Sequence, residues 1–421
     1  MENHVATDRI IRVGKNQIKN LIKLISGRSL AEPVINPTTL DTDDVALAKR
    51  LLNKPSAWTT CEEVSHYEDV FAKWNGSRHA FAFMSGRTAL SACIHALGLR
   101  QGDEVIIPGY TCVVVPNSFQ FANVKVVYCD IELETYGPDA ASLETKITPK
   151  TRAILLHHLY GLLCRDYEAI LELAKLHGLW VIEDCAQATG VEYKGKKVGN
   201  RGDVAFYSSE QSKVFNTVQG GLAVTNDESL ANRLCDYQQA APYPDEAWIR
   251  RLLYTLILDY YRFKHPRRWW LGDVYELMHG GKRLVSTTAE EKKGIKPAHY
   301  GRRMPAAIAA LGLNQLKKID AYNEKRRSTA TGWDKWCDDN GRAKPLIVKD
   351  SSPVFLRYPV LVEPEKKKDT SWALRELGVR AGVWFKTHLH PADRAVEGCP
   401  NADRAVERCI NLPGLLNDAK N

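Results

Sequence analysis

The chain lacks the long apolar runs that mark membrane-spanning and secreted proteins. A spanning helix requires roughly 18–20 consecutive apolar residues, and the longest apolar stretch, residues 252–261, already contains Asp259. The amino terminus carries a glutamate at position two and no apolar stretch followed by a small-residue cleavage site. We therefore expect neither a spanning helix nor a secretory signal.

The cysteines do not form a recognisable framework. All ten are scattered, with no C-x-x-C pair and no Cys/His cluster at the spacing of zinc ligands. Neither a set of disulfides nor a bound metal is expected from this pattern. Unpaired cysteines are typical of a reducing compartment, so the expected location is cytoplasmic.

The charge balance is also moderate. A net charge of +8 over 421 residues comes with no zinc finger, glycine-rich RNA motif or dense arginine stripe. Nucleic acid is therefore not an expected partner, whereas anionic small molecules or a membrane surface are compatible with the positive charge. The length predicts two or three domains of an ordinary globular protein.

Short apolar runs alternate with helical periodicity between about residues 81 and 224. This alternation is typical of strands joined by crossover helices, so we predict an α/β fold with a mostly parallel sheet. Polar residues gather just after the strands, where open α/β sheets bind their ligands. The predicted strands cover residues 80–84, 104–107, 125–129, 153–157, 179–182, 204–207 and 221–225.

The pattern changes after Tyr243. Residues 245–296 predict aromatic and basic helices and include a charged hinge at 290–293, residues 304–337 predict one long amphipathic helix, and residues 355–362 predict a strand. We divide the chain into four segments: an N-terminal extension (1–44), a large domain (45–244), a helical insertion (245–298) and a small C-terminal α+β domain (299–421).

Ser85, Gly86 and Arg87 follow the first predicted strand and open a helix. Backbone N–H groups at a helix start, with the positive end of the helix dipole behind them, bind phosphate groups. A simple capped turn is the alternative if these residues are taken alone.

Asp184 ends another apolar strand, and Gln187 lies three positions further, within reach of the same ligand if the chain turns helical. An acid at a strand end can equally hold magnesium in a nucleotide-binding protein. Residues 190–196 imitate a phosphate loop, but Lys197 stands where a serine or threonine should bind the magnesium. The nucleotide-hydrolase interpretation is therefore set aside.

Lys213 lies between Ser208 and the pair Gly220–Gly221. Most lysines are solvated surface charges, but a serine able to bind phosphate and glycines that permit close backbone approach favour a site here. The amine can form a Schiff base with the aldehyde of pyridoxal phosphate, while Asp184 keeps the pyridine nitrogen protonated. These strand-end residues together predict a pyridoxal-phosphate site.

Several short motifs occur in order along the chain. They are Ser-Gly-Arg-Thr-Ala-Leu (85–90), Gly-Asp-Glu-Val-Ile-Ile-Pro (102–108), His-Leu-Tyr-Gly (158–161), Ile-Glu-Asp-Cys-Ala-Gln (182–187), Gln-Gly-Gly (219–221) and Asn-Leu-Pro (411–413). With them, roughly residues 45–421 resemble the DegT/DnrJ/EryC1/StrS family of pyridoxal-phosphate-dependent sugar aminotransferases.

The resemblance implies an aspartate-aminotransferase-like fold (fold type I) and a homodimer with its sites at the subunit interface. It implies that Lys213 forms the Schiff base, that Asp184 pairs with the pyridine nitrogen and that Gln187 faces the ring hydroxyl. It also gives phosphate-contacting positions to three further residues, Gly86, Arg87 and Ser208.

The chain departs from the family pattern at two positions. Cys112 stands where the family usually places an aromatic residue over the cofactor ring, and we expect Tyr110 to supply the stacking instead. Gly301 stands where the partner subunit normally offers an asparagine to the phosphate. The neighbouring Arg302 is the expected replacement for that contact.

The implied reaction moves an amino group from an amino acid, usually glutamate, to a keto sugar that is commonly nucleotide-linked, in polysaccharide or amino-sugar biosynthesis. Family dehydratases carry histidine in place of the lysine, so Lys213 favours amino transfer. A non-catalytic binding homologue is a third hypothesis, because of the departures at Cys112 and Gly301.

Residues 245–296 are longer than the family typically shows and are rich in tryptophan, tyrosine, lysine and arginine. A dimer arm or a lid over the substrate is one interpretation. The other is peripheral membrane contact, shared with residues 10–28, where isoleucine and leucine recur at helical spacing beside lysines.

Overall fold

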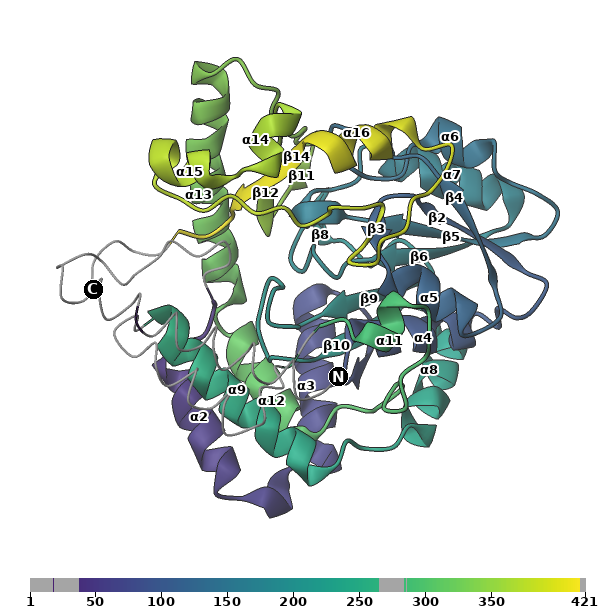
Figure 1. Ribbon diagram of the computed structural model, residues 1–421. Helices are drawn as coiled ribbons and strands as arrows, with labels where there is room; N and C mark the ends of the chain where they lie inside the picture. The colour runs from purple at the N-terminus through teal and green to yellow at the C-terminus, as the bar shows by residue number, and fades with distance from the viewer. Residues whose placement is uncertain (1–17, 19–37, 265–283, 285, 417–421) are drawn as a thin grey trace, which may run out of the picture.

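A computed structural model describes residues 18, 38–264, 284 and 286–416 of the chain. A seven-stranded sheet of order β1-β10-β9-β6-β5-β2-β4 lies at its centre (Figure 1). Only β10 runs antiparallel to its neighbours. The strands are β1 (His79–Phe83), β2 (Glu104–Pro108), β4 (Lys125–Cys129), β5 (Thr151–His157), β6 (Trp180–Asp184), β9 (Val204–Ser208) and β10 (Gly221–Thr225). The predicted mostly parallel sheet is confirmed.

Apolar side chains on both faces of the sheet explain why these segments form strands. Ala82, Ile106 and Ile154 pack into one core cluster, whereas Phe83 and Val105 pack into the other. Parallel sheets are buried on both faces in this way. The helices of this part of the chain are α3 (Cys61–Asn75), α4 (Gly86–Ala96), α5 (Val114–Gln120), α6 (Ala140–Glu144), α7 (Tyr167–His177) and α8 (Glu228–Ala240).

Three further helices complete the core on the side of α3. Helix α2 (Thr42–Leu52) packs against α9 (Glu246–Lys264), and α12 (Ala306–Leu316) packs against both α2 and α3. The buried apolar residues of α9, including Ile249, Leu252 and Leu256, belong to the same core cluster. The apolar face of α9 is therefore covered by protein.

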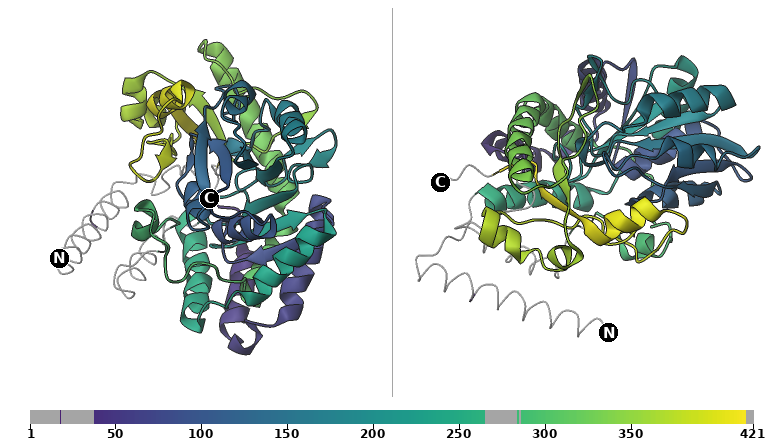
Figure 2. Two further views of the ribbon diagram at one scale, coloured as in Figure 1. Left: turned by 90° about the vertical axis from the view of Figure 1, so that its right-hand side faces the viewer. Right: turned by 90° about the horizontal axis from the view of Figure 1, so that it is seen from above.

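The C-terminal elements form a separate core beside the sheet, coloured green to yellow in Figure 1 and seen from two other sides in Figure 2. Strands β12 (Arg357–Leu361) and β14 (Cys409–Pro413) pair antiparallel there. The helices of this part are α13 (Ile319–Asp339), α14 (Pro364–Lys368), α15 (Ser371–Leu377) and α16 (Pro400–Arg408). The small domain was predicted to begin at residue 299, but α12 packs into the main core. The start of α13 is therefore a better boundary between the large and the small domain. The four-segment division stays a prediction.

The remaining elements are short. They are the 3-10 turns η1 (Pro55–Ala57) and η2 (Leu159–Gly161), the strand pair β3 (Thr111–Cys112) and β13 (Leu389–His390), the helix α11 (Ala289–Lys292), and a small sheet of β7 (Glu192–Tyr193), β8 (Lys196–Lys197) and β11 (Ser351–Ser352). The segment that imitates a phosphate loop thus forms a hairpin and opens no helix.

Two predictions for the part of the chain after Tyr243 were wrong, one of a helix and one of a hinge. The single helix predicted over 304–337 is broken into α12 and α13, because the chain turns at Lys317–Lys318 to join two different cores, and the Lys318 ammonium binds Asp44 of α2. The predicted hinge at 290–293 lies largely in α11, where Thr288 and Glu291 form a capping box. Within the described residues, no helix is long and apolar enough to cross a bilayer.

Candidate active site

Among the described residues, a large cavity opens where β5, β6 and β9 end and α4 begins. Its volume is about 860 Å³, which is ample for a cofactor and a substrate together. Eight of the nine predicted site residues line it; Tyr110 does not. The eight are Gly86, Arg87, Cys112, Asp184, Gln187, Ser208, Lys213 and Arg302.

The start of α4 forms an anion cradle in the cavity wall. Ser85 caps the helix by accepting a hydrogen bond from the Thr88 backbone at 3.3 Å, and the first N–H groups of a helix have no partner within it. A Cβ on Gly86 would lie 3.0 Å from the Ser208 Cβ, and one on Gly221 would lie 2.5 Å from the Ser85 carbonyl carbon. Glycine at both positions therefore lets the end of β9 and the start of β10 approach the helix start.

The Arg87 side chain turns away from this cradle. Its guanidinium pairs with the Glu291 carboxylate on α11 and donates to the Ser286 carbonyl. The Glu291 carbonyl in turn accepts a hydrogen bond from Asn117 of α5 at 2.7 Å. The segment that begins at Ser286 is thereby fixed across the helix start, and the Arg87 guanidinium is engaged with this segment.

Asp184 ends β6 with one carboxylate oxygen facing the cavity uncommitted. Its Oδ1 accepts a hydrogen bond from the Ala186 backbone at 3.0 Å, and within the described residues Oδ2 has no partner. Removal from water raises the pKa of Asp184 to about 6, although the Ala186 N–H and the Lys213 charge act in the opposite direction. A buried carboxylate with one free oxygen is stabilised by a cationic N–H group that donates to that oxygen.

Lys213 reaches the cavity from the loop between β9 and β10. The loop is held by hydrogen bonds between Ser209 and Thr217, and by Arg326 of α13, which donates to the Val214 carbonyl at 2.6 Å. The Lys213 Nζ lies 5.0 Å from the centroid of the Trp384 ring. These hydrogen bonds therefore fix the loop backbone before and after Lys213.

Gln187 has one defined polar contact. Its Oε1 accepts a hydrogen bond from the Tyr160 backbone at 2.9 Å. This contact orients the amide so that its NH₂ group remains available as a donor. A phenolic ring hydroxyl is a suitable acceptor for that group.

Cys112 lies in the cavity wall, but Tyr110 lies behind it. Burial raises the pKa of the Cys112 thiol, and the charges of Lys213 and Arg87 partly offset this effect. The Tyr110 ring is fully buried against Phe385, and its hydroxyl contacts that of Tyr160 at 3.0 Å. The prediction that Tyr110 stacks over the cofactor is therefore not supported, because packing holds its ring in the core.

Arg302 lines the cavity of its own chain. Its guanidinium donates to the Tyr243 carbonyl at 3.3 Å, and its carbonyl accepts from the Met84 backbone. Gly301 has a φ of +78°, a conformation that favours glycine. The predicted phosphate contact of Arg302 stays a prediction.

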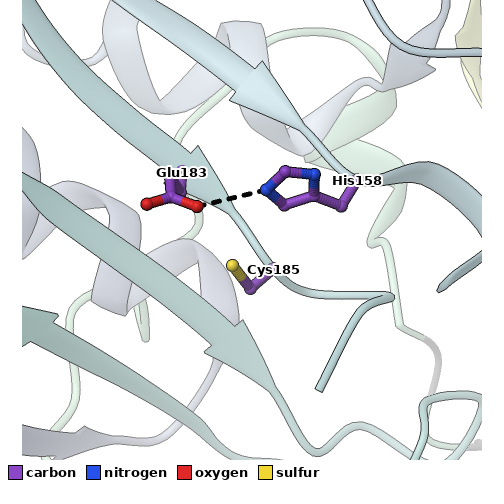
Figure 3. A group of neighbouring side chains, drawn as sticks. All are labelled: His158, Glu183 and Cys185. Carbon is purple, nitrogen blue, oxygen red and sulfur yellow. Dashed lines mark hydrogen bonds and ion pairs between the residues drawn. The ribbon is translucent and has the colours of Figure 1, made fainter. Parts of the chain in front are cut away.

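A buried cluster lies directly beneath Asp184. His158, Glu183 and Cys185 bring their ligand-type atoms within 4.8 Å of one another (Figure 3). The Glu183 oxygens already accept hydrogen bonds from several donors. These are His158 Nε2 at 3.1 Å, the Tyr167 hydroxyl at 2.9 Å, and the backbones of Gly199 at 2.8 Å, Arg201 at 3.0 Å and Gly202 at 2.6 Å.

These donors decide the character of the cluster. Burial alone would raise the pKa of Glu183, but the hydrogen bonds from His158 and the backbone hold it at about 2. Since Nδ1 of His158 accepts from the Cys164 backbone, Nε2 must be the protonated nitrogen. The cluster is thus a hydrogen-bonded support for the end of β6 and needs no metal.

Sequence reasoning missed several residues of the cavity. Trp384, Arg357 and His157 line its inner part, and Trp248 and Arg251 of α9 line it from the insertion. Trp384 and Arg357 come from the C-terminal part of the chain, more than a hundred positions beyond Lys213, so no local spacing pointed to them. Trp248 lies in the segment 245–296, whose aromatic composition alone does not indicate a position in the cavity.

The residues in place fit pyridoxal phosphate. The cradle at Gly86 and Ser208 suits a phosphate, the free Asp184 oxygen suits a protonated ring nitrogen, and the Lys213 amine suits an aldehyde. All three groups face one cavity. The chemistry of these donors, and not the fold alone, therefore matches the cofactor.

Comparison with known proteins gives the same answer. The sequence profile of the DegT/DnrJ/EryC1/StrS aminotransferase family matches residues 39–250 and 275–417. The GDP-perosamine synthase of Caulobacter vibrioides is 43% identical over 83% of this chain and 84% of its own length, and that of Escherichia coli O157:H7 is 40% identical over 80% and 75%.

Solved structures agree. The crystal structure of an aminotransferase from Psychrobacter cryohalolentis matches with a TM-score of 0.68 and 25% identity, covering 90% of this chain and 94% of the other. The predicted fold, enzyme class and cofactor are confirmed. The chain belongs to the DegT/DnrJ/EryC1/StrS aminotransferase family and is a pyridoxal-phosphate-dependent aminotransferase.

Proposed function

We propose that this enzyme transfers an amino group from an amino acid, with glutamate the first donor to test, to a nucleotide-linked keto sugar. Two relatives of at least 40% identity are GDP-perosamine synthases. A GDP-linked keto sugar is accordingly the first acceptor to test. The product would be an amino sugar for polysaccharide or related biosynthesis.

One observation carries the proposal. The Asp184 carboxylate and the Lys213 amine face the same cavity from two different strand ends, with the anion cradle of α4 in the same wall. When bound there, pyridoxal phosphate supplies a protonated ring that accepts the negative charge produced when a C–H bond beside nitrogen breaks. Each of the three anchoring groups of the chain matches a different part of that molecule.

The protein residues have separate roles in this proposal. Lys213 would hold the cofactor through its aldehyde, and its Nζ, when free, would serve as the base that takes a proton from the donor carbon. Asp184 holds the proton on the ring nitrogen. Gln187 orients the ring through its hydroxyl, and the backbone at Gly86 with Ser208 binds the phosphate.

Product analysis tests the reaction. The wild-type enzyme with glutamate and a GDP-linked keto sugar should yield a GDP-linked amino sugar and 2-oxoglutarate, detected by mass spectrometry. A product that has lost a hydroxyl group without gaining nitrogen would establish the dehydratase alternative instead. A colourless protein that ignores added pyridoxal phosphate would establish the non-catalytic alternative.

Replacing Lys213 with alanine should lower turnover by at least about 10³-fold, because both covalent attachment and proton transfer are lost. Lys197→Ala, on the β8 hairpin, is the matched control and should retain activity. A Lys213→Ala enzyme with near-normal turnover would remove the catalytic assignment.

We further propose a homodimer in the cytoplasm, with each site at the subunit interface. Peripheral membrane contact stays part of the proposal only through residues 10–28, of which the structure describes Ile18 alone; residues 265–283 of the insertion lie outside the described residues. The described part of the insertion supports the lid interpretation: α9 buries its apolar face on α2, and Trp248 and Arg251 line the cavity. Sedimentation with anionic liposomes tests the contact.

A further inference from the structure

Arg357 is a buried cation of the cavity wall that the proposed chemistry does not use. It is the first residue of β12, and only 7% of its surface is exposed. Its guanidinium lies 4.1 Å from the centroid of the Trp384 ring, and its Nε has no hydrogen-bond partner among the described residues. A guanidinium so placed has donors left for a ligand.

Two other arginines near Lys213 and the start of α4 are held by protein partners. Arg87 pairs with Glu291, and Arg326 donates to Asn323 and to the Val214 carbonyl. Within the described residues, no carboxylate lies within ion-pair distance of Arg357. A buried charge without a counter-ion is costly, and such a charge is usually balanced by a partner.

The charge of Arg357 persists at neutral pH. Burial lowers its pKa to about 10, while Tyr160 and Glu210 act in the opposite direction. The Glu210 carboxylate lines the same cavity but is held by Ser212, whose backbone N–H donates to it at 3.0 Å. Glu210 therefore stabilises the cation from a distance without occupying its donors.

The Trp384 ring contacts both this cation and the reacting amine. The Lys213 Nζ and the Arg357 guanidinium carbon both lie within about 5 Å of the centre of the same indole ring, a contact that attracts cations. In an α-amino acid, the carboxylate is attached to the very carbon that bears the amine. An amino-acid donor that brings its nitrogen to the Lys213 position therefore brings a carboxylate into the neighbourhood of Arg357.

The acceptor does not meet this requirement. In a nucleotide-linked keto sugar, the sugar ring separates the diphosphate from the reacting carbonyl, and the cofactor phosphate belongs at the start of α4. A planar guanidinium also matches a carboxylate through two parallel hydrogen bonds. The anion that fits here is a small carboxylate attached next to the reacting nitrogen.

We propose that Arg357, held against Trp384, binds the α-carboxylate of the amino-acid donor. The inference rests on the proposed function and adds to it the residue that selects amino acids over simple amines. Arg357 would touch the substrate and would leave the cofactor unchanged.

Two small amines test the proposal directly. Aminooxyacetate carries a carboxylate and methoxyamine does not, yet both react with a pyridoxal aldehyde, so the loss of the visible absorption band gives a rate constant for each. The wild-type protein should favour aminooxyacetate by at least about tenfold, and Arg357→Gln should bring the ratio of the two rates close to one.

The donor half-reaction gives the second measurement. Glutamate should convert the Arg357→Gln enzyme about 30- to 100-fold less efficiently than the wild type, as expected for loss of one buried charged partner. Conversion of the aminated enzyme by the keto sugar should stay within about threefold of wild type. Arg357→Lys should fall between the two, because it keeps the charge and loses the planar fork.

Arg342→Gln is the matched control. Arg342 also lies over a tryptophan, Trp336, but pairs with Glu363 and does not line the cavity. Its amine ratio should equal that of the wild type. A wild-type ratio near one, or a ratio unchanged in Arg357→Gln, would overturn the inference for Arg357; a wild-type protein without a visible band would instead overturn the proposed function.

Discussion

At the residue scale, Asp184 is placed for function at a cost in stability. Its carboxylate accepts one backbone hydrogen bond and otherwise faces the cavity, and its pKa is raised from 3.8 to about 6 by removal from water. Between these two values the folded protein binds more protons than the unfolded chain. Stability therefore falls as the pH rises from about 4 to about 6.

Replacing Asp184 with asparagine should stabilise the cofactor-free protein at pH 7.5 by about 1–3 kcal/mol, because the charge is no longer held away from water. The gain should disappear at pH 4, where the aspartate is also neutral. Thermal unfolding at both pH values is the measurement, and amino transfer should be lost in parallel. Equal stabilisation at the two pH values would contradict the assigned cause.

The sequence was informative about the site because most of its residues follow strand ends. Gly86, Asp184, Ser208 and Lys213 each come just after a predicted strand, and parallel strands bring such positions to one edge of the sheet. Arg357 begins a strand of the C-terminal core, so its approach to Lys213 depends on how two cores pack. No local pattern carries that information.

At the element scale, helix α11 holds the segment that begins at Ser286 across the start of α4. Glu291 is 1% exposed, pairs with Arg87 and completes a capping box with Thr288. Its carbonyl also accepts the Asn117 amide. The closure thus depends on one buried carboxylate and one backbone contact.

Replacing Glu291 with alanine should loosen this closure, because the partly buried Arg87 guanidinium loses its counter-ion at a cost of roughly 1–3 kcal/mol. Limited proteolysis should then cut the chain within residues 286–300 at least about tenfold faster than in the wild type. Glu290→Ala changes an exposed neighbour on the same helix and should leave the rate unchanged. Equal cleavage of both variants would argue against the ion pair as the fastening.

The limits of the central strands were predictable because these strands are buried on both faces of the sheet. Strands β4 (Lys125–Cys129) and β10 (Gly221–Thr225) have the predicted limits, and the other sheet strands differ by one or two residues. The break between α12 and α13 was not predictable, because apolar periodicity continues through Lys317–Lys318 while the partner core changes. Periodicity reports that a face is buried, but not which core buries it.

At the scale of the whole molecule, we predict a homodimer. Sedimentation analysis should give twice the chain mass of 47.3 kDa, and dilution to monomer should lower the activity if the sites lie at the interface. Trp384 and Arg357 line the cavity from the C-terminal part of the same chain. A monomer with full activity would contradict the dimer while leaving these two residues in place.

The central claim is that Lys213 carries the cofactor and yields it to an amino donor. Borohydride reduction followed by peptide mass spectrometry measures this directly, because reduction fixes the pyridoxyl group on the lysine that holds it. The account predicts a pyridoxyl group on Lys213 in the resting enzyme and its disappearance when glutamate is added before reduction. A label on a different lysine, or a Lys213 label that no amino-acid donor removes, would contradict it.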